Sequence, residues 1–168
     1  LDLALAGAAA SNPTLSANGR LYRNDAGTFV EVASFFGVVS GKLSWSDING
    51  DGHADLTVTG NHGSSVINNL QLNLGSWEFA ALPLHSGGVN WVDTRFLDWD
   101  GDGDLDLLGG VNSIVAAYLN PGTGEFPSTA AASTSFRCRA LRFGDFDGDA
   151  DFDVLVSNIG TSGFLGQS

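Results

Sequence analysis

Three short segments carry most of the acid in this chain, and in each of them polar side chains recur at every second residue. They hold thirteen of the 19 aspartate and glutamate residues, whereas the whole chain has only 7 lysine and arginine residues and a formal charge of −12. Each segment follows the pattern D-x-[DN]-G-D-[GA]-x-x-D, which an aliphatic residue follows. Positions 1, 3, 5, 7 and 9 are Asp47, Asn49, Asp51, His53 and Asp55 in the first loop, Asp98, Asp100, Asp102, Asp104 and Asp106 in the second, and Asp145, Asp147, Asp149, Asp151 and Asp153 in the third.

This spacing can gather oxygen atoms around one cation. We expect the side chains of positions 1, 3, 5 and 9 to converge with the backbone carbonyl of position 7, which belongs to His53, Asp104 and Asp151 in the three loops. Glycine at position 4, and at position 6 of the first two loops, permits the tight coil that this convergence requires. Oxygen-only ligands in a flexible loop suit Ca²⁺ better than Zn²⁺, and a Mg²⁺ site would use fewer carboxylates and more water. The sequence therefore predicts three calcium sites.

Two other interpretations of the loops fit the sequence less well. An EF-hand loop ends in a bidentate glutamate at position 12, but position 12 here is Val58, Gly109 and Val156. Aspartate and glycine also favour plain turns. Three copies of one pattern in the same register argue against that simpler interpretation.

The loops mark a longer repeat. They begin 51 and 47 residues apart, and an aromatic residue stands two residues before each of them. Repeats of this length are typical of propellers, solenoids and arrays. Strands are predicted after the loops at residues 54–59, 105–108 and 152–156, then at 66–74 and 114–119, and then at 77–82 and more weakly near Phe126. Four short strands per repeat is the pattern of a propeller blade.

The ends of the chain extend this scheme. Residues 1–5 align with residues 54–58, so that Asp2 takes position 9 of a loop whose first part is absent, and residues 20–24 and 29–33 supply further strands. We therefore expect an all-β chain in which residues 1–168 form a single β-propeller segment of about 3.5 blades. The predicted blades are residues 1–37 (partial), 38–87, 88–133 and 134–168 (partial).

The pattern resembles the FG-GAP/VCBS repeats, which occur in integrin α-subunit β-propellers and in many secreted bacterial proteins. Residues 20–32, Arg-Leu-Tyr-Arg-Asn-Asp-Ala-Gly-Thr-Phe-Val-Glu-Val, are also similar to a stretch common between bacterial copies. The resemblance implies blades of four antiparallel strands, with a calcium loop between the first and second strand of each. Such propellers usually have about seven blades, so it also implies part of a larger ring or a piece that another chain completes.

Two residues depart from the family pattern. Asn49 stands where the other loops have aspartate, and Ala150 replaces glycine at position 6 of the third loop. If position 6 requires a left-handed backbone, alanine costs about 1 kcal/mol there. We expect the third site to be the weakest.

The aromatic residues separate into two groups. Trp45, Phe96 and Phe143 recur at one repeat position and are predicted to lie in the core between blades. Trp99 lies in a loop, and its apolar counterparts in the other loops favour packing over an exposed role. Trp77 and Trp91 have no aromatic counterpart, so they are the better candidates for a ligand face, although a structural role in the core is favoured for both. His53 stands at position 7 of the first loop, and its imidazole is expected to be merely solvated.

Composition excludes several classes of function. No basic stripe exists to neutralise nucleic-acid phosphates, and the charge disfavours an anionic membrane surface. No apolar run approaches the roughly 18 residues of a membrane span. A lone Cys138 cannot form an internal disulfide and is expected to be a buried, inert thiol. No catalytic motif is present and the acids are committed to the loops, so the chain is not expected to be an enzyme.

Three functions remain open. The first is an extracellular module for protein binding or adhesion, and the second is a lectin that binds carbohydrate between blades. The third is an assembly subunit whose broken blades are completed by another chain. Weak calcium sites would be empty in the cytosol, so a secreted or cell-surface location is expected.

Overall fold

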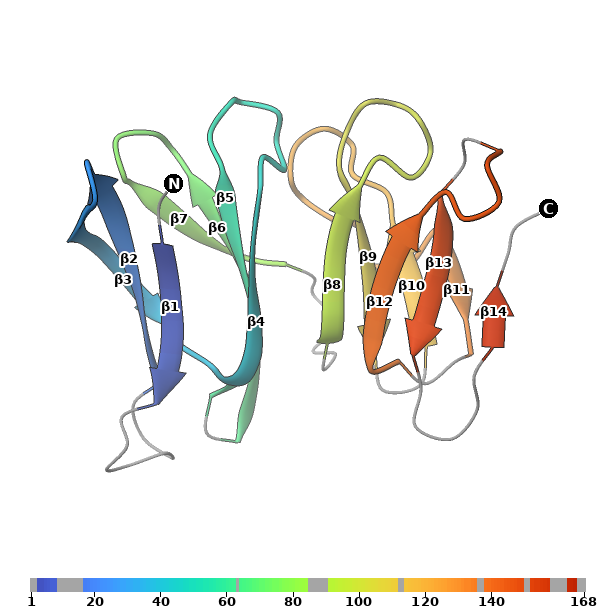
Figure 1. The fold of residues 1–168 in the computed structure, drawn as a ribbon, viewed down its shortest axis with the longest axis horizontal. Coiled ribbons are helices and arrows are strands. Elements are labelled where there is room, and N and C mark those ends of the chain that lie inside the picture. The colour runs from blue at the N-terminus through green and yellow to red at the C-terminus, as the bar shows by residue number, and fades with distance from the viewer. Residues whose placement is uncertain are drawn as a thin grey trace. The chain divides into compact units, whose positions relative to one another are not determined.

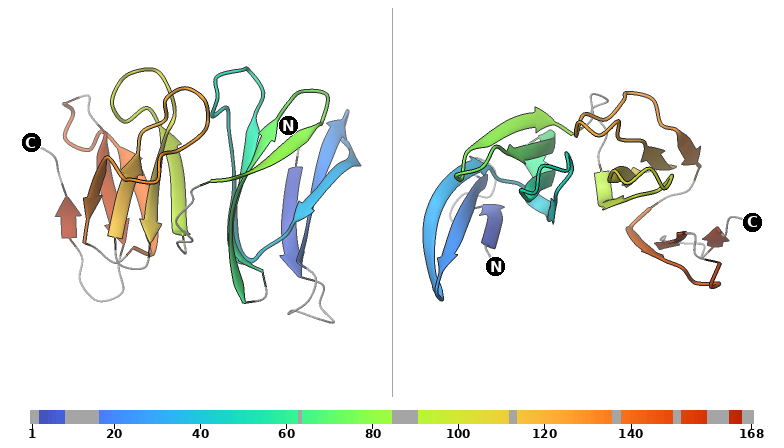
Figure 2. Two further views of the ribbon diagram at one scale, coloured as in Figure 1. Left: turned by 180° about the vertical axis from the view of Figure 1, so that it is seen from behind. Right: turned by 90° about the horizontal axis from the view of Figure 1, so that it is seen from above.

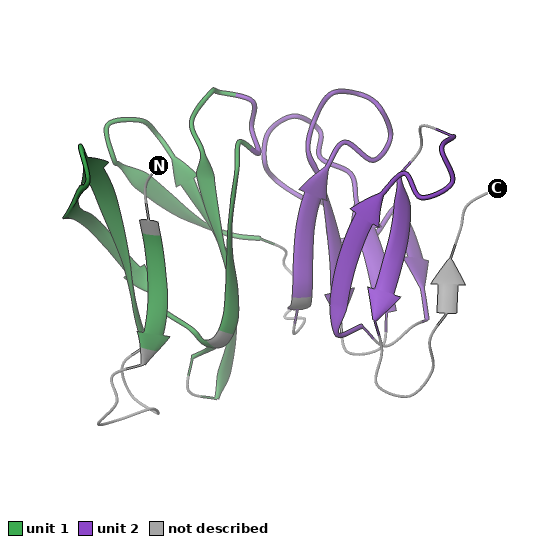
Figure 3. Cartoon of the chain, viewed as in Figure 1, with its two compact units in different colours: residues 1–47, 51–88 green, residues 48–50, 89–168 purple. Residues whose placement is uncertain are grey.

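The computed structural model describes residues 3–8, 17–62, 64–84, 91–111, 114–135, 138–149, 152–157 and 163–165. Within these ranges the regular structure consists of fourteen β-strands and no helix, which confirms the all-β class (Figure 1). The chain divides into two compact units, one made of residues 1–47 and 51–88 and the other of residues 48–50 and 89–168 (Figure 3). No helix in the described ranges is long and apolar enough to cross a membrane.

Unit 1 contains two antiparallel sheets built from strands that follow one another in the chain. The first sheet has the order β1-β2-β3, and the second has the order β4-β5-β6-β7. The strands are β1 (Leu3–Ala8), β2 (Ala17–Asp25), β3 (Thr28–Phe36), β4 (Val39–Ser46), β5 (Asp55–His62), β6 (Ser65–Asn73) and β7 (Phe79–Pro83). Antiparallel neighbours need only short connections, which fits the glycine- and asparagine-rich turns between them.

Unit 2 also contains two antiparallel sheets of consecutive strands, but here the four-stranded sheet comes first in the chain and the three-stranded sheet second. Its first sheet has the order β11-β10-β9-β8 and its second has the order β12-β13-β14. The strands are β8 (Trp91–Leu97), β9 (Asp106–Val111), β10 (Ile114–Tyr118), β11 (Ala132–Thr134), β12 (Ala140–Gly144), β13 (Asp153–Ser157) and β14 (Gly163–Leu165). The strand predicted near Phe126 is wrong, because β11 begins six residues later. Phe126 instead lies in the connection, where its ring centroid is 6.0 Å from that of Phe96.

Each unit has its own apolar core. In unit 1, Leu21, Val38, Leu56 and Val58 are buried together, with partly buried residues of both sheets against them. In unit 2 the buried groups are Leu97, Leu108 and Ala117, and Val115, Cys138, Leu141 and Val156. The prediction of a buried Cys138 is confirmed, since its sulfur lies against Gly110, where an added Cβ would come within 2.1 Å of it.

The structure decides between the two roles considered for Trp91 and corrects the prediction for Trp45. Trp91 is only 3 % exposed and packs edge-on against Tyr118, with the ring centroids 5.8 Å apart, so it forms no ligand face. Gly109 makes this possible, because a Cβ there would lie 1.7 Å from the indole ring. Conversely, Trp45 was expected in the core but is 36 % exposed.

Topology places the acidic loops together with other turns. Residues 47–54 join β4 to β5, and residues 74–78 join β6 to β7. In an antiparallel sheet, alternate connections leave from the same end. Both connections therefore lie at one end of the sheet, as Figures 1 and 2 show.

Candidate metal centre

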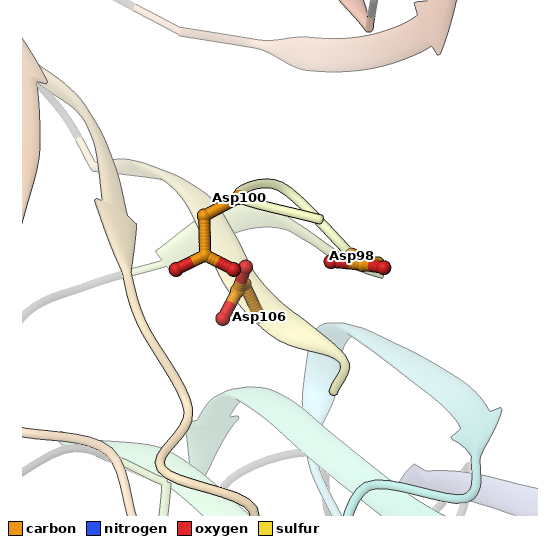
Figure 4. Close-up of side chains that lie close together, drawn as sticks. All are labelled: Asp98, Asp100 and Asp106. Atoms are coloured by element: carbon orange, nitrogen blue, oxygen red, sulfur yellow. The ribbon is translucent and has the colours of Figure 1, made fainter. Parts of the chain in front are cut away.

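The second loop brings three of its predicted ligands together. Asp98, Asp100 and Asp106 each offer a carboxylate oxygen, and these oxygens all lie within 4.8 Å of one another. Figure 4 shows the carboxylates of Asp100 and Asp106 facing each other, with Asp98 beside them. In the third loop, Asp145, Asp147 and Asp149 form a group of the same kind. Positions 1 and 3 thus take part in both groups.

The carboxylate at position 1 organises the coil of its loop. Asp98 accepts hydrogen bonds from the backbone N–H groups of Gly101 (2.8 Å) and Gly103 (3.1 Å). Asp47 accepts from Asp51 (3.1 Å) and Gly52 (2.9 Å) in the first loop. In the third loop the corresponding bonds run from Gly148 (2.6 Å) and Asp149 (3.1 Å) to Asp145. Because these bonds lie within nine residues, the loop sequence itself builds the coil.

Glycine takes the left-handed backbone that the coil requires. Gly50 and Gly52, at positions 4 and 6 of the first loop, have φ of +69° and +86°. Gly101 and Gly103 take the same positions in the second loop, with φ of +78° and +96°. Gly148 at position 4 of the third loop has φ of +84°. Side chains larger than hydrogen are strained at such angles. Position 6 of the third loop, Ala150, lies outside the described residues, as does Asp151. The weakness predicted for the third site therefore stays a prediction.

The aspartate at position 9 ties each loop to the sheet. Asp55 and Asp106 are fully buried, and each accepts a hydrogen bond of 2.8 Å from the backbone N–H of an asparagine, Asn73 or Asn120. Asp106 also accepts from the N–H of Trp99 at 2.9 Å. Asp153 makes the same contact with the N–H of Phe146, again at 2.9 Å. Position 9 is therefore a structural anchor as well as a candidate ligand.

The first loop differs in its ligand types. Asp47 and Asn49 are partly buried and Asp51 is exposed. Position 3 is an amide, and among the described residues the three aspartates of this loop, Asp47, Asp51 and Asp55, do not gather as closely as the carboxylates of the other two loops. Exposed Asp102 and partly buried Asp104 complete the second loop, where the N–H of Asp104 donates to Asp102 at 2.9 Å.

Two segments of the chain, residues 47–109 and 98–156, match the model of the FG-GAP-like repeat. Together these matches cover about two thirds of the chain. The chain belongs to the FG-GAP-like repeat family. Each match begins at position 1 of one acidic loop and extends beyond position 9 of the next, so the repeat seen in the sequence is the repeat of the family. Comparison with curated proteins found no match.

FG-GAP-like repeats generally bind calcium, and the acidic groups of this chain could hold a metal. The donor set fits Ca²⁺, because carboxylate, amide and carbonyl oxygens are its usual ligands. The candidate ligands here are the fifteen residues at positions 1, 3, 5, 7 and 9. At position 7, the residues His53, Asp104 and Asp151 would each contribute a backbone carbonyl oxygen.

Electrostatics in the FG-GAP-like loops also favours a cation. Partial desolvation raises the pKa of Asp100 above its ordinary 3.8, and the carboxylate of Asp102 raises it further against an opposing backbone hydrogen bond. At Asp147 the hydrogen bond from the N–H of Asp149 lowers the pKa, but desolvation and the carboxylates of Asp149 and Asp153 outweigh it. Both pKa values therefore lie above the ordinary value, because desolvation and crowded negative charge both disfavour the ionised form.

Sequence reasoning missed the two asparagines that brace the repeats. Asn120 is 2 % exposed; its amide donates to the carbonyls of Ile48 (2.7 Å) and Leu105 (3.1 Å). Its side-chain oxygen accepts from Gly122 (3.0 Å) and Gly124 (3.1 Å). In the preceding repeat, Asn73 donates to Ala54 and accepts from Gly75 in the same way. The shared pattern N-x-G-x-x-E-F at residues 73–79 and 120–126 is the signal that could have identified them.

Proposed function

We propose that this chain is part of a calcium-binding, non-catalytic β-propeller that serves as a binding or adhesion module outside the cell. The observation that carries the proposal is the convergence of three carboxylates within each of two loops of an FG-GAP-like repeat. The four sheets are the blades in this proposal. Each acidic loop joins the first and second strands of its sheet, the place that the family resemblance implies.

Calcium has a structural role in this proposal. Three Ca²⁺ ions would bring +6, which reduces the formal charge from −12 to −6 and relieves the repulsion inside the loops. Since each position 9 aspartate is anchored to its sheet, an ion that holds the loop also holds the ends of two strands. Extracellular calcium modules typically bind with Kd of about 10⁻⁴–10⁻³ M, and sites this weak would fill only outside the cytosol.

The aspartates of the loops support a non-catalytic role. General acid and base catalysis needs titratable groups that are available to a substrate, whereas these carboxylates accept backbone hydrogen bonds and are candidates for metal coordination. Protein binding or adhesion is the function that the resemblance implies first. Completion of the outer blades by another chain remains a further proposal, to be tested by the mass of the assembly in solution.

Calcium titration calorimetry tests the proposal, with Asp100→Ala and the matched exposed-charge control Glu125→Gln. The wild type and the control should each bind three Ca²⁺, whereas Asp100→Ala should bind two. Removing calcium with EDTA should lower the melting temperature of the wild type. Absence of calcium heat, or an identical melt with and without EDTA, would overturn the calcium proposal.

A further inference from the structure

Unit 1 holds a pocket of about 460 Å³ beside the first acidic loop. It lies between the β4–β5 connection and the β6–β7 turn, which share one end of the sheet. Three of its lining side chains are aromatic, namely Trp45, Trp77 and Phe79. His53, Asn73 and Ser76 contribute polar groups. A concave site with apolar walls and a few polar groups is the usual form of a small-ligand site.

Trp77 lines this pocket at a conformational cost. Its φ is +67°, in the left-handed region that a bulky side chain rarely adopts. Trp77 follows Asn73 by four residues, and the residue that follows Asn120 by four in the next repeat is Gly124, with φ of +75°. Glycine therefore meets the demand of this turn without strain, and unit 1 instead places a tryptophan there. Strained residues of this kind cluster at ligand sites.

The chemistry of the lining favours a neutral, hydroxylated ligand. Aromatic faces carry negative quadrupole charge, which attracts the polarised C–H bonds on one face of a sugar ring. The imidazole of His53, the amide of Asn73 and the hydroxyl of Ser76 can exchange hydrogen bonds with hydroxyl groups. Among the described residues that line the pocket there is no carboxylate to pair with an organic cation and no lysine or arginine to pair with an anion.

We propose that this pocket binds one pyranose ring of a neutral saccharide, with Trp77 as the stacking platform. The inference deepens the proposed function, on which it rests, because it names the class of ligand that the binding module takes. The site lies within one sheet, between the acidic loop and the next turn. It also gives a role to His53, whose imidazole was expected to be merely solvated.

The same histidine connects the pocket to the metal loop. The backbone N–H of His53 donates to Asp51 at 2.8 Å, and both residues are candidate contributors to the calcium site. Its ring packs over Gly75 in the facing turn, where an added Cβ would lie 3.2 Å from Nε2. A change in the loop therefore moves a wall of the pocket. Calcium should strengthen saccharide binding without contacting the sugar.

Ligand-detected NMR with free glucose, galactose, mannose, fucose and N-acetylglucosamine tests the proposal, with choline as the cationic comparison. The wild type in calcium should give saturation transfer from at least one sugar. Trp77→Gly should weaken that sugar roughly tenfold or more, and Trp77→Phe should retain part of the affinity. Phe29→Ala removes a 52 % exposed aromatic outside the pocket and should bind as the wild type does.

Several controls separate the possible outcomes. Trp77→Gly carries the residue of the next repeat, so it should fold and keep the wild-type calcium stoichiometry. Sugar binding that survives Trp77→Gly, transfer from no sugar, or transfer from choline alone would overturn the saccharide proposal. If calorimetry finds no calcium while Trp77-dependent sugar binding persists, the pocket stands and the calcium proposal fails. If calcium binds but no sugar gives a signal, the calcium proposal stands and the saccharide proposal fails.

Discussion

Replacement of Asn120 by alanine tests how the repeats are held together. The side chain makes four hydrogen bonds to backbone groups within unit 2 and is 2 % exposed. A buried hydrogen bond contributes about 1 kcal/mol net, so the loss should be about 4 kcal/mol. That is a large part of the 5–15 kcal/mol by which domains are usually stable.

Asn73→Ala is the matched control, because Asn73 has the same place in the preceding repeat. Its side chain makes two such bonds, at 3.1 and 3.0 Å, and it is only partly buried. Water can replace the lost partners there, so we expect a loss of about 1–2 kcal/mol. The measurement is urea unfolding of both variants in saturating calcium, followed by tryptophan fluorescence.

The difference between the two variants is the decisive quantity. A free-energy loss for Asn120→Ala that exceeds that for Asn73→Ala by about 2 kcal/mol supports the hydrogen-bond count. Equal losses would show that the number of hydrogen bonds in the structure does not determine how much these turns contribute to the free energy of unfolding. A change in the denaturant slope would instead indicate an altered denatured state.

Three further predictions concern charge. Asp93→Ala should lower the free energy of unfolding, measured by urea titration, by about 3 kcal/mol. The reason is that the fully buried carboxylate of Asp93 pairs with Arg95 at 2.9 Å and accepts a hydrogen bond from the N–H of Leu141 at 3.0 Å. A loss below about 1 kcal/mol would contradict this. Asp100→Asn should keep a weakened calcium site in calorimetry, because position 3 of the first loop is already an amide, and complete loss of that site would contradict the comparison. Acidification should weaken calcium binding at the second and third loops, because the raised pKa values of Asp100 and Asp147 let protons compete with the metal at a higher pH than an ordinary aspartate, with its pKa of 3.8, would allow. A calcium affinity at about pH 4 equal to that at neutral pH would contradict this.

The acidic loops could be predicted from the sequence because their determinants are local. Glycines with positive φ and an aspartate that accepts nearby N–H groups lie within nine residues, and the pattern shows all of them. The positions of the tryptophans could not be predicted in the same way. Trp91 is buried because Gly109 on the neighbouring strand leaves room for its ring, and no spacing in the sequence shows that pairing.

The pocket was missed for a related reason. The side chain of His53 was treated as irrelevant because only its carbonyl was needed at position 7. The structure places its ring against a turn more than twenty residues later in the chain. Phe146 gives the opposite example: Ile48, at the same position of the first loop, is 1 % exposed, whereas Phe146 is 56 % exposed. Equivalent repeat positions share a backbone, whereas burial depends on what the neighbouring segments supply.

The pairing of each strand with its neighbour in sequence has a consequence for biosynthesis. In the described part of the chain, every sheet is complete within a stretch of fewer than fifty residues. A ribosome adds about 5–20 residues per second, so one such stretch emerges in several seconds, whereas a hairpin forms in about 1–10 μs. Each sheet can therefore fold before the next one has been made, and its loop can be coiled before its successor exists. Newly made sheets then join neighbours that are already ordered, which limits the time that unpaired strand edges spend exposed to other chains.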